Sequence, residues 1–137
     1  MKYIKKFLES SGSVDFEWEL KDFVQDQLAY LIDDGFVCNV FKAVFHPGSI
    51  KILIKLDDLV NGEHDIDFTW RQIEDKFVPF IYMLNRDYTI SEIKFFYEES
   101  RSIKFDTDKD IKQILSGGAD RYLTNGAFYQ ITIMVKE

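Results

Sequence analysis

The sequence predicts an α+β fold in which helices cover one face of an antiparallel sheet of about five to six strands, arranged in hairpins. Two long segments have apolar residues at helical spacing, and several shorter segments are rich in β-forming residues or alternate between apolar and polar. Short turn sequences separate these segments. With 137 residues and the single Cys38, one core without an internal disulfide is expected.

The first predicted element is an amphipathic helix that ends before Gly35, a residue suited to the left-handed stop. Ser13 or Asp15 can cap its amino end. Residues 1–13, which contain "KYIKK" and "SSGS", are expected to be a flexible basic segment, and residues 14–137 a single α+β domain. The apolar stripe of this helix comprises Phe16, Leu20, Phe23, Val24, Leu28, Leu31 and Ile32.

A first hairpin is predicted next, with strands "FVCNVFKAVF" (36–45) and "IKILIKL" (50–56) joined by an "HPGS" turn. The second strand has isoleucines on one side and Lys51 and Lys55 on the other, so one of its faces should be exposed. The following "DDLVNGEHD" (57–65) is predicted to be a polar loop with an Asn61-Gly62 turn.

The second helix is predicted to start near Asp67, with a kink or break near Val78 because Pro79 removes a backbone donor. A second hairpin follows, formed by "TISEIKFFYEE" (89–99) and "SIKFD" (102–106). The apolar stripe of the helix comprises Trp70, Ile73, Phe77, Phe80, Ile81 and Leu84.

The last predicted elements are a short helix from about Asp108 to Leu115 and a third hairpin. The short helix ends at Gly117-Gly118, and the hairpin joins "RYLT" (121–124) to "YQITIMV" (129–135) through an Asn125-Gly126 turn. The alternation of the last segment places Tyr129, Ile131, Ile133 and Val135 on one side.

The two tryptophans lie in similar pentapeptides, "VDFEW" (14–18) and "IDFTW" (66–70). A shift of 52 residues aligns the pentapeptides, and a shift of 53 aligns the helical stripes that follow, as a helix-hairpin repeat would require. However, at about 100° per residue Trp18 lies roughly 200° from Phe16, away from the apolar stripe, whereas Trp70 lies on its stripe. A duplication and the recurrence of a helix-start pattern both remain open.

The overall charge restricts the classes of partner. With 24 acidic and 17 basic side chains the net charge is −7, which repels phosphate backbones, so nucleic-acid binding is not expected. No apolar run approaches the roughly 20 residues that cross a bilayer, and "MKYIKKFLES" lacks the long apolar centre of a secretory signal. We therefore expect a cytoplasmic protein with no membrane association.

Three groups of residues have some features of a chemical site. "DTDKD" (106–110) begins like a calcium loop, but Ile111 and Gly117 occupy the positions where that loop needs Gly and Glu, so a helix start is the favoured interpretation. A small enzyme using His64 with Asp65 and Asp67, or Cys38 with His46, remains an alternative function, although nothing around Cys38 marks a helix amino end that would lower its pKa. The two histidines with a carboxylate could also bind zinc, but they lack a recurrent ligand spacing. We expect no cofactor, no metal and no catalytic residues.

A protein-contact surface is the preferred hypothesis, because Trp18 points away from the apolar stripe and lies among acidic residues. An alternative is that the first twelve residues or the edge of the sheet cover it. A further alternative is self-assembly through sheet edges or the strand from Phe95 to Tyr97, so a homo-oligomer is a second type of partner. The contact candidates are Glu17, Trp18, Asp22, Gln25, Asp26 and Asp33.

The amino-terminal ten residues, "MKYIKKFLES", resemble the leaders of proteins packaged in the heads of large contractile-tailed bacteriophages. The departure is that Leu8 and Glu9 are adjacent, without the intervening residue of the usual cleavage pattern. The resemblance implies a phage-encoded protein, in the host cytoplasm or the virion, that is a virion component or an inhibitor of a host factor. The residues that match in type are Met1, Lys2, Tyr3, Phe7, Leu8 and Glu9. Together these observations predict a small, acidic, non-enzymatic binding or structural protein.

Overall fold

The computed structural model describes residues 13–58, 63–98, 101–124 and 126–136. Its helices are α2 (Ser13–Gln27), α3 (Ala29–Asp33), α4 (Trp70–Asp87), α5 (Asp108–Ser116) and α6 (Asp120–Leu123). Its strands are β1 (Phe36–Lys42), β2 (Ser49–Asp58), β3 (Glu63–Ile66), β4 (Phe68–Thr69), β5 (Thr89–Glu98), β6 (Arg101–Phe105), β7 (Ala127–Phe128) and β8 (Gln130–Lys136).

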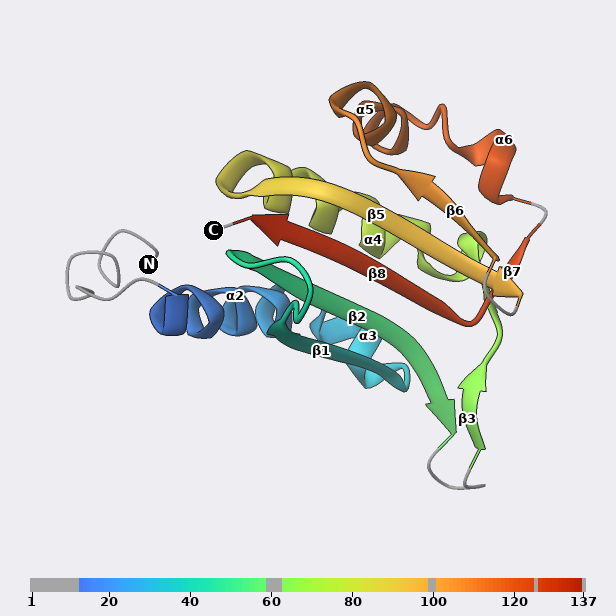
Figure 1. Ribbon diagram of the computed structural model, residues 1–137. Helices are drawn as coiled ribbons and strands as arrows, with labels where there is room; N and C mark the ends of the chain where they lie inside the picture. Colours follow the sequence, from blue (N-terminus) through green and yellow to red (C-terminus); the bar gives the residue numbers. More distant parts are fainter. Residues whose placement is uncertain (1–12, 59–62, 99–100, 125, 137) are drawn as a thin grey trace.

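The main sheet has the strand order β1-β2-β8-β5-β6, and β3 pairs with the far end of β2. All its pairings are antiparallel, and β4 and β7 form a separate two-stranded sheet. Figure 1 shows α2, α3 and α4 lying behind the main sheet, while the face toward the viewer has no helix across it. The predicted α+β class, with helices covering one face of an antiparallel sheet, is confirmed.

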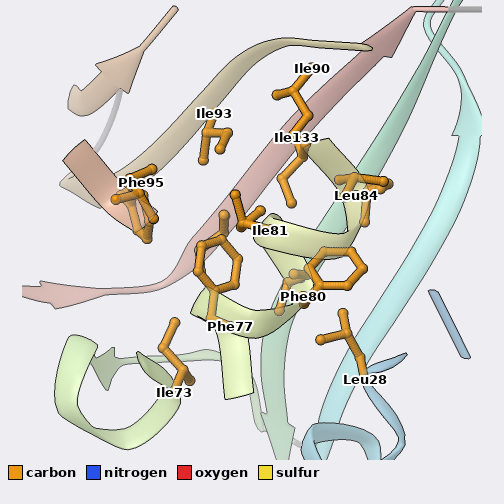
Figure 2. Close-up of a cluster of buried hydrophobic side chains, with 14 of the residues drawn as sticks. Leu28, Ile73, Phe77, Phe80, Ile81, Leu84, Ile90, Ile93, Phe95 and Ile133 are labelled. Atoms are coloured by element: carbon orange, nitrogen blue, oxygen red, sulfur yellow. The ribbon is translucent and has the colours of Figure 1, made fainter. Parts of the chain in front are cut away.

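The core lies between the sheet and the helices. The predicted stripe of α4 is confirmed, because all six of its members are buried. In Figure 2 its phenylalanines and aliphatic residues point toward Ile93, Phe95 and Ile133 of the sheet and toward Leu28. The aromatic rings meet edge to face, as in the contacts of Phe95 with Trp70 at 5.7 Å and with Phe77 at 5.7 Å between ring centroids.

The first predicted helix is divided into two, because the backbone at Leu28 (φ −108°, ψ 19°) leaves the helical region. The break turns the following residues about the helix axis, so Leu31 is buried while Ile32, predicted to be in the core, is 39% exposed. That prediction for Ile32 is wrong. The predicted stop at Gly35 is confirmed, because its φ is +100°.

The first hairpin forms as predicted, but β1 ends at Lys42 instead of continuing through Phe45. The backbone N–H of Ala43 donates to Ser49, which closes the ladder and leaves the intervening residues in the turn. The loop predicted at 57–65 is also wrong in part, because residues 63–66 form β3 and pair with β2. The predicted Asn61-Gly62 turn lies outside the described residues.

Helix α4 begins at Trp70, three residues later than predicted, because Thr69 caps it. The backbone N–H of Thr69 donates to Oε1 of Gln72 at 2.8 Å, the back-bond of a capping box. Of the kink or break predicted near Val78, the break does not occur, since α4 continues through Pro79 to Asp87, and the kink stays a prediction. Proline removes one backbone donor, and the six buried side chains of the stripe hold the helix on the sheet.

The second hairpin (β5 and β6) and the short helix α5 are confirmed. Thr107 caps α5 by accepting from the backbone N–H of Asp110 at 3.1 Å, and Gly117 ends it with φ +85°. Asp108 and Asp110 therefore belong to a helix start, the interpretation favoured for "DTDKD".

The third hairpin is wrong. Residues 120–123 form α6, and β7 pairs with β4. β8 lies between β2 and β5 and forms ladders with both. In this central position β8 makes backbone hydrogen bonds on both sides, and Ile131, Ile133 and Val135 are completely buried. In the predicted hairpin one edge of β8 would have no neighbouring strand.

Candidate functional site

The candidate contact residues lie on α2, whose inner face is fixed by the core. Leu20 and Val24 are fully buried there, so residues on the opposite side of the helix must face outward. At about 100° per residue, Asp22 lies about 40° to one side of Trp18 and Gln25 about 20° to the other. Trp18, Asp22 and Gln25 therefore form one outward row, and we call this surface the α2 contact face.

Trp18 is the main apolar residue of the α2 contact face, with 61% of its surface exposed. The Lys21 ammonium lies 5.5 Å from the centroid of its ring, within the range of a cation–π contact. Lys21 also pairs with Glu17, one turn earlier, with 3.2 Å between Nζ and Oε2. The ring is thus supported from one side by a charged pair while it remains accessible to a partner.

The remaining candidates add negative charge but do not all belong to the same row. Asp26 is exposed beside it, about 80° from Trp18. Asp33 is exposed too, but it lies on α3 beyond the break at Leu28, so the structure does not bring it into the row. Between residues 16 and 34 there are six acidic side chains and one basic side chain, a net charge of −5.

The β1–β2 connection carries an apolar feature that the sequence did not predict. Val44 and Phe45 are 84% and 88% exposed, although both were assigned to a strand. The start of α2 and this connection lie toward the same end of the molecule in Figure 1. The signal in the sequence is the position of the two residues directly before "HPGS", where the turn leaves them outside the ladder.

A second feature that was missed lies on the buried side of α2. Glu19 is only 9% exposed, and the Tyr88 hydroxyl donates to its Oε1 at 2.8 Å. Burial, together with this hydrogen bond to the Glu19 carboxylate, raises the pKa of Tyr88. The pair ties α2 to the carboxyl end of α4 and leaves the α2 contact face free of this carboxylate.

The structure does not bring Cys38 and His46 together. Cys38 lies in the middle of β1 opposite Ile54. The ladder ends at Lys42, four residue positions and about 13 Å further along the strand. His46 is an exposed residue of the turn beyond that end. Burial raises the pKa of the Cys38 thiol to about 12, so the thiol is protonated at neutral pH and is a poor nucleophile.

The structure describes the other candidate set only in part. His64 and Asp65 lie in β3, with side chains outside the described part of the chain, and Asp67 is an exposed residue between β3 and β4. Among the described residues, no group of three His, Cys, Asp or Glu side chains is arranged as a metal site.

A comparison with protein-family models, curated proteins and solved structures finds no match to this chain. Within the described residues, every helix is too short or too polar to span a bilayer.

Proposed function

We propose that this chain is a non-enzymatic protein that acts through protein–protein contacts, with the α2 contact face as its binding surface. The observation that carries the proposal is the exposure of Trp18, 61% of whose surface meets solvent within a strongly acidic helix. A tryptophan brings 150–250 Å² of surface, so on the order of 100 Å² remains to be covered by a partner. At about 25 cal/mol per Å², that burial would contribute about 2.5 kcal/mol to binding.

The chemistry of the surface defines the partner. An apolar recess should receive the Trp18 ring, since buried aromatic residues dominate binding energy at interfaces. Basic side chains around the recess should meet Asp22 and Asp26, which would accelerate association and select the orientation. We therefore propose a partner with a basic surface surrounding an apolar pocket.

The biological setting is a second part of the proposal. The resemblance of residues 1–10 to phage head-protein leaders supports a phage-encoded chain, present in the host cytoplasm or the virion. In that setting the contact would be that of a virion component or of an inhibitor of a host factor.

Site-specific photo-crosslinking tests the proposal. A photoreactive phenylalanine analogue replaces Trp18 in one variant and Tyr82 in a control, because Tyr82 is a similarly exposed (58%) aromatic residue on the unrelated helix α4. We expect a discrete crosslinked species from position 18 in producing cells, and its loss when Asp22→Lys and Asp26→Lys are added. Equal crosslinking from both positions, or none from position 18, would remove the α2 contact face from the proposal.

A further inference from the structure

The face of the main sheet opposite the helices is the second large surface of the molecule. Figure 1 shows that none of the helices crosses it. Because neighbouring strand residues alternate between faces, the register assigns its side chains directly. We call it the open sheet face. Its residues include Phe41 of β1, Lys51, Leu53, Lys55 and Asp57 of β2, Thr132, Met134 and Lys136 of β8, Glu92, Lys94 and Phe96 of β5, and Lys104 of β6.

Lysines and apolar residues share this face in adjacent rows. Lys51 lies between Phe41 and Met134 in the register, and Lys94 lies beside Lys104. The five strands of the main sheet path carry seven basic and four acidic residues, a net charge of +3. Helices α2 and α3 carry six acidic residues and one basic residue, a net charge of −5. On the open sheet face itself the register places five lysines (Lys51, Lys55, Lys94, Lys104 and Lys136) with two carboxylates (Asp57 and Glu92), so this face is basic whereas α2 and α3 are acidic.

The two surfaces also match in size. With 15 residues, α2 is about 22 Å long, and the seven-residue strands β1 and β8 are each about 24 Å long. Two open sheet faces placed against each other would bring lysines against lysines, which disfavours a face-to-face dimer. Helix α2 is acidic, carries a projecting aromatic ring and is about as long as these strands. It therefore complements the open sheet face in charge and in size.

We infer that the partner of the α2 contact face is a second copy of this chain, with α2 of one molecule docked on the open sheet face of the next. This inference rests on the proposed function and names its partner. Asp22 and Asp26 meet the lysines, and Trp18 packs on Phe41, which is 39% exposed and lies opposite Lys51 in the register. The two surfaces in contact are different, so the association is head-to-tail and builds a ring or an open chain of molecules.

Single-stranded nucleic acid is the main competing occupant of a lysine-bearing sheet. The aromatic rings of this face, Phe41 and Phe96, lie on β1 and β5, and the open-face residues of the central strand between them, Gln130, Thr132 and Met134, provide no ring that would continue a stacking path. The observations favour the helix of a second copy.

Complementary charge reversal tests the inference. Variant one is D22K/D26K on α2, variant two is K51E/K94E on the sheet, and the control is E74K/D75K on α4. Sedimentation velocity over a wide range of concentration should show self-association of wild type and control. Each reversed variant alone should associate at least about tenfold more weakly. An equimolar mixture of the two variants should associate again, because each basic helix then meets an acidic sheet and each acidic helix a basic sheet.

A wild-type protein that stays monomeric at every concentration would overturn the inference, as would a mixture that fails to associate when the wild type does. Tight binding of a fluorescent single-stranded oligonucleotide by the monomer, lost in K51E/K94E, would replace a second copy with nucleic acid. The proposed function is tested separately from this inference. If the wild type is monomeric but position 18 crosslinks to a different protein, the proposed function stands and only the inference of a second copy is wrong.

Discussion

The two tryptophans occupy opposite environments although the residues before them are nearly the same. Trp70 is 1% exposed, lies in the aromatic core, and donates its indole N–H to Oδ1 of Asp120 at 2.9 Å. Trp18 is 61% exposed and contacts the flexible Lys21. Similar short sequences therefore do not produce similar sites, and the difference depends on where each helix begins.

The two pentapeptides fold differently. Residues 14–18 all lie within α2, which begins at Ser13. Residues 66–70 run from the end of β3 through β4 to the first residue of α4, with Thr69 as the cap. Trp18 is thus carried by a helix whose buried face is already occupied by Leu20 and Val24, whereas Trp70 starts the buried stripe of α4.

In the two helix-hairpin units that follow, the helices resemble each other more than the strands do. The shift of 53 residues pairs Leu20, Val24, Leu28 and Leu31 with Ile73, Phe77, Ile81 and Leu84, and all eight are buried. Their strands take different places: the first strand of the first unit, β1, is an edge strand, whereas the first strand of the second unit, β5, lies inside the sheet. A helical stripe is a local property, while the place of a strand depends on which other strand pairs with it.

The largest expected effect concerns Trp70. Replacing it with alanine removes a buried ring from contact with Phe77 and Phe95 and leaves a cavity, so we expect a loss of about 3–5 kcal/mol in the free energy of unfolding. Urea denaturation measures it. Trp70→Phe keeps most of the ring volume but loses the donor to Asp120, and it should cost clearly less. Equal losses for both variants would show that the hydrogen bond, and not the packing, holds this helix start.

The next effect concerns the hydrogen bond from the Tyr88 hydroxyl, at the end of α4, to Glu19 of α2. Tyr88→Phe leaves the nearly buried Glu19 carboxylate without this donor, and we expect a loss of about 1–3 kcal/mol in unfolding free energy. Tyr82→Phe, at an exposed position of α4, is the matched control and should change stability by less than about 0.5 kcal/mol.

The same tyrosine gives a pH dependence. Burial and Glu19 raise the pKa of Tyr88 above its ordinary value of 10.0, so the folded protein holds the phenol proton more tightly than the unfolded chain does. The contribution is fully present below about pH 10 and declines above it, by at most about 1.4 kcal/mol of unfolding free energy per pH unit. Denaturation at a series of alkaline pH values should show this decline in the wild type and a weaker decline in Tyr88→Phe.

A third, smaller effect distinguishes the ends of the two helical segments. Helix α4 ends at Tyr88 in an extended conformation, whereas the α2–α3 segment ends before Gly35, whose φ of +100° is unfavourable for any residue with a Cβ. Gly35→Ala should cost about 1–2 kcal/mol in unfolding free energy. Gly118→Ala is the control, because its added Cβ would meet only ordinary contacts and no positive φ is required. A loss at Gly118 that equals the loss at Gly35 would contradict the conformational explanation.

The features predicted correctly from the sequence depend on interactions between residues that are close together in the chain. The stripes of α2 and α4, the stop at Gly35 and the outward direction of Trp18 all follow from spacing within one helix. The place of β8 does not, because "YQITIMV" has the same alternation at an edge as between β2 and β5. The break at Leu28 has no glycine or proline to indicate it, and the charge of the open sheet face emerges only once the strand order is known.

The smallest effect on stability is expected at Trp18. Trp18→Ala removes a ring that is mostly in water, so the unfolding free energy should change by no more than about 0.5 kcal/mol, while self-association through the α2 contact face should be lost. Fluorescence can follow each tryptophan separately. In Trp18→Phe the remaining Trp70 should emit at shorter wavelength and resist quenching by iodide, whereas in Trp70→Phe the remaining Trp18 should be readily quenched. Strong protection of Trp18 in dilute solution would mean that the ring is already covered within a single molecule, and the α2 contact face would then be unavailable to any partner.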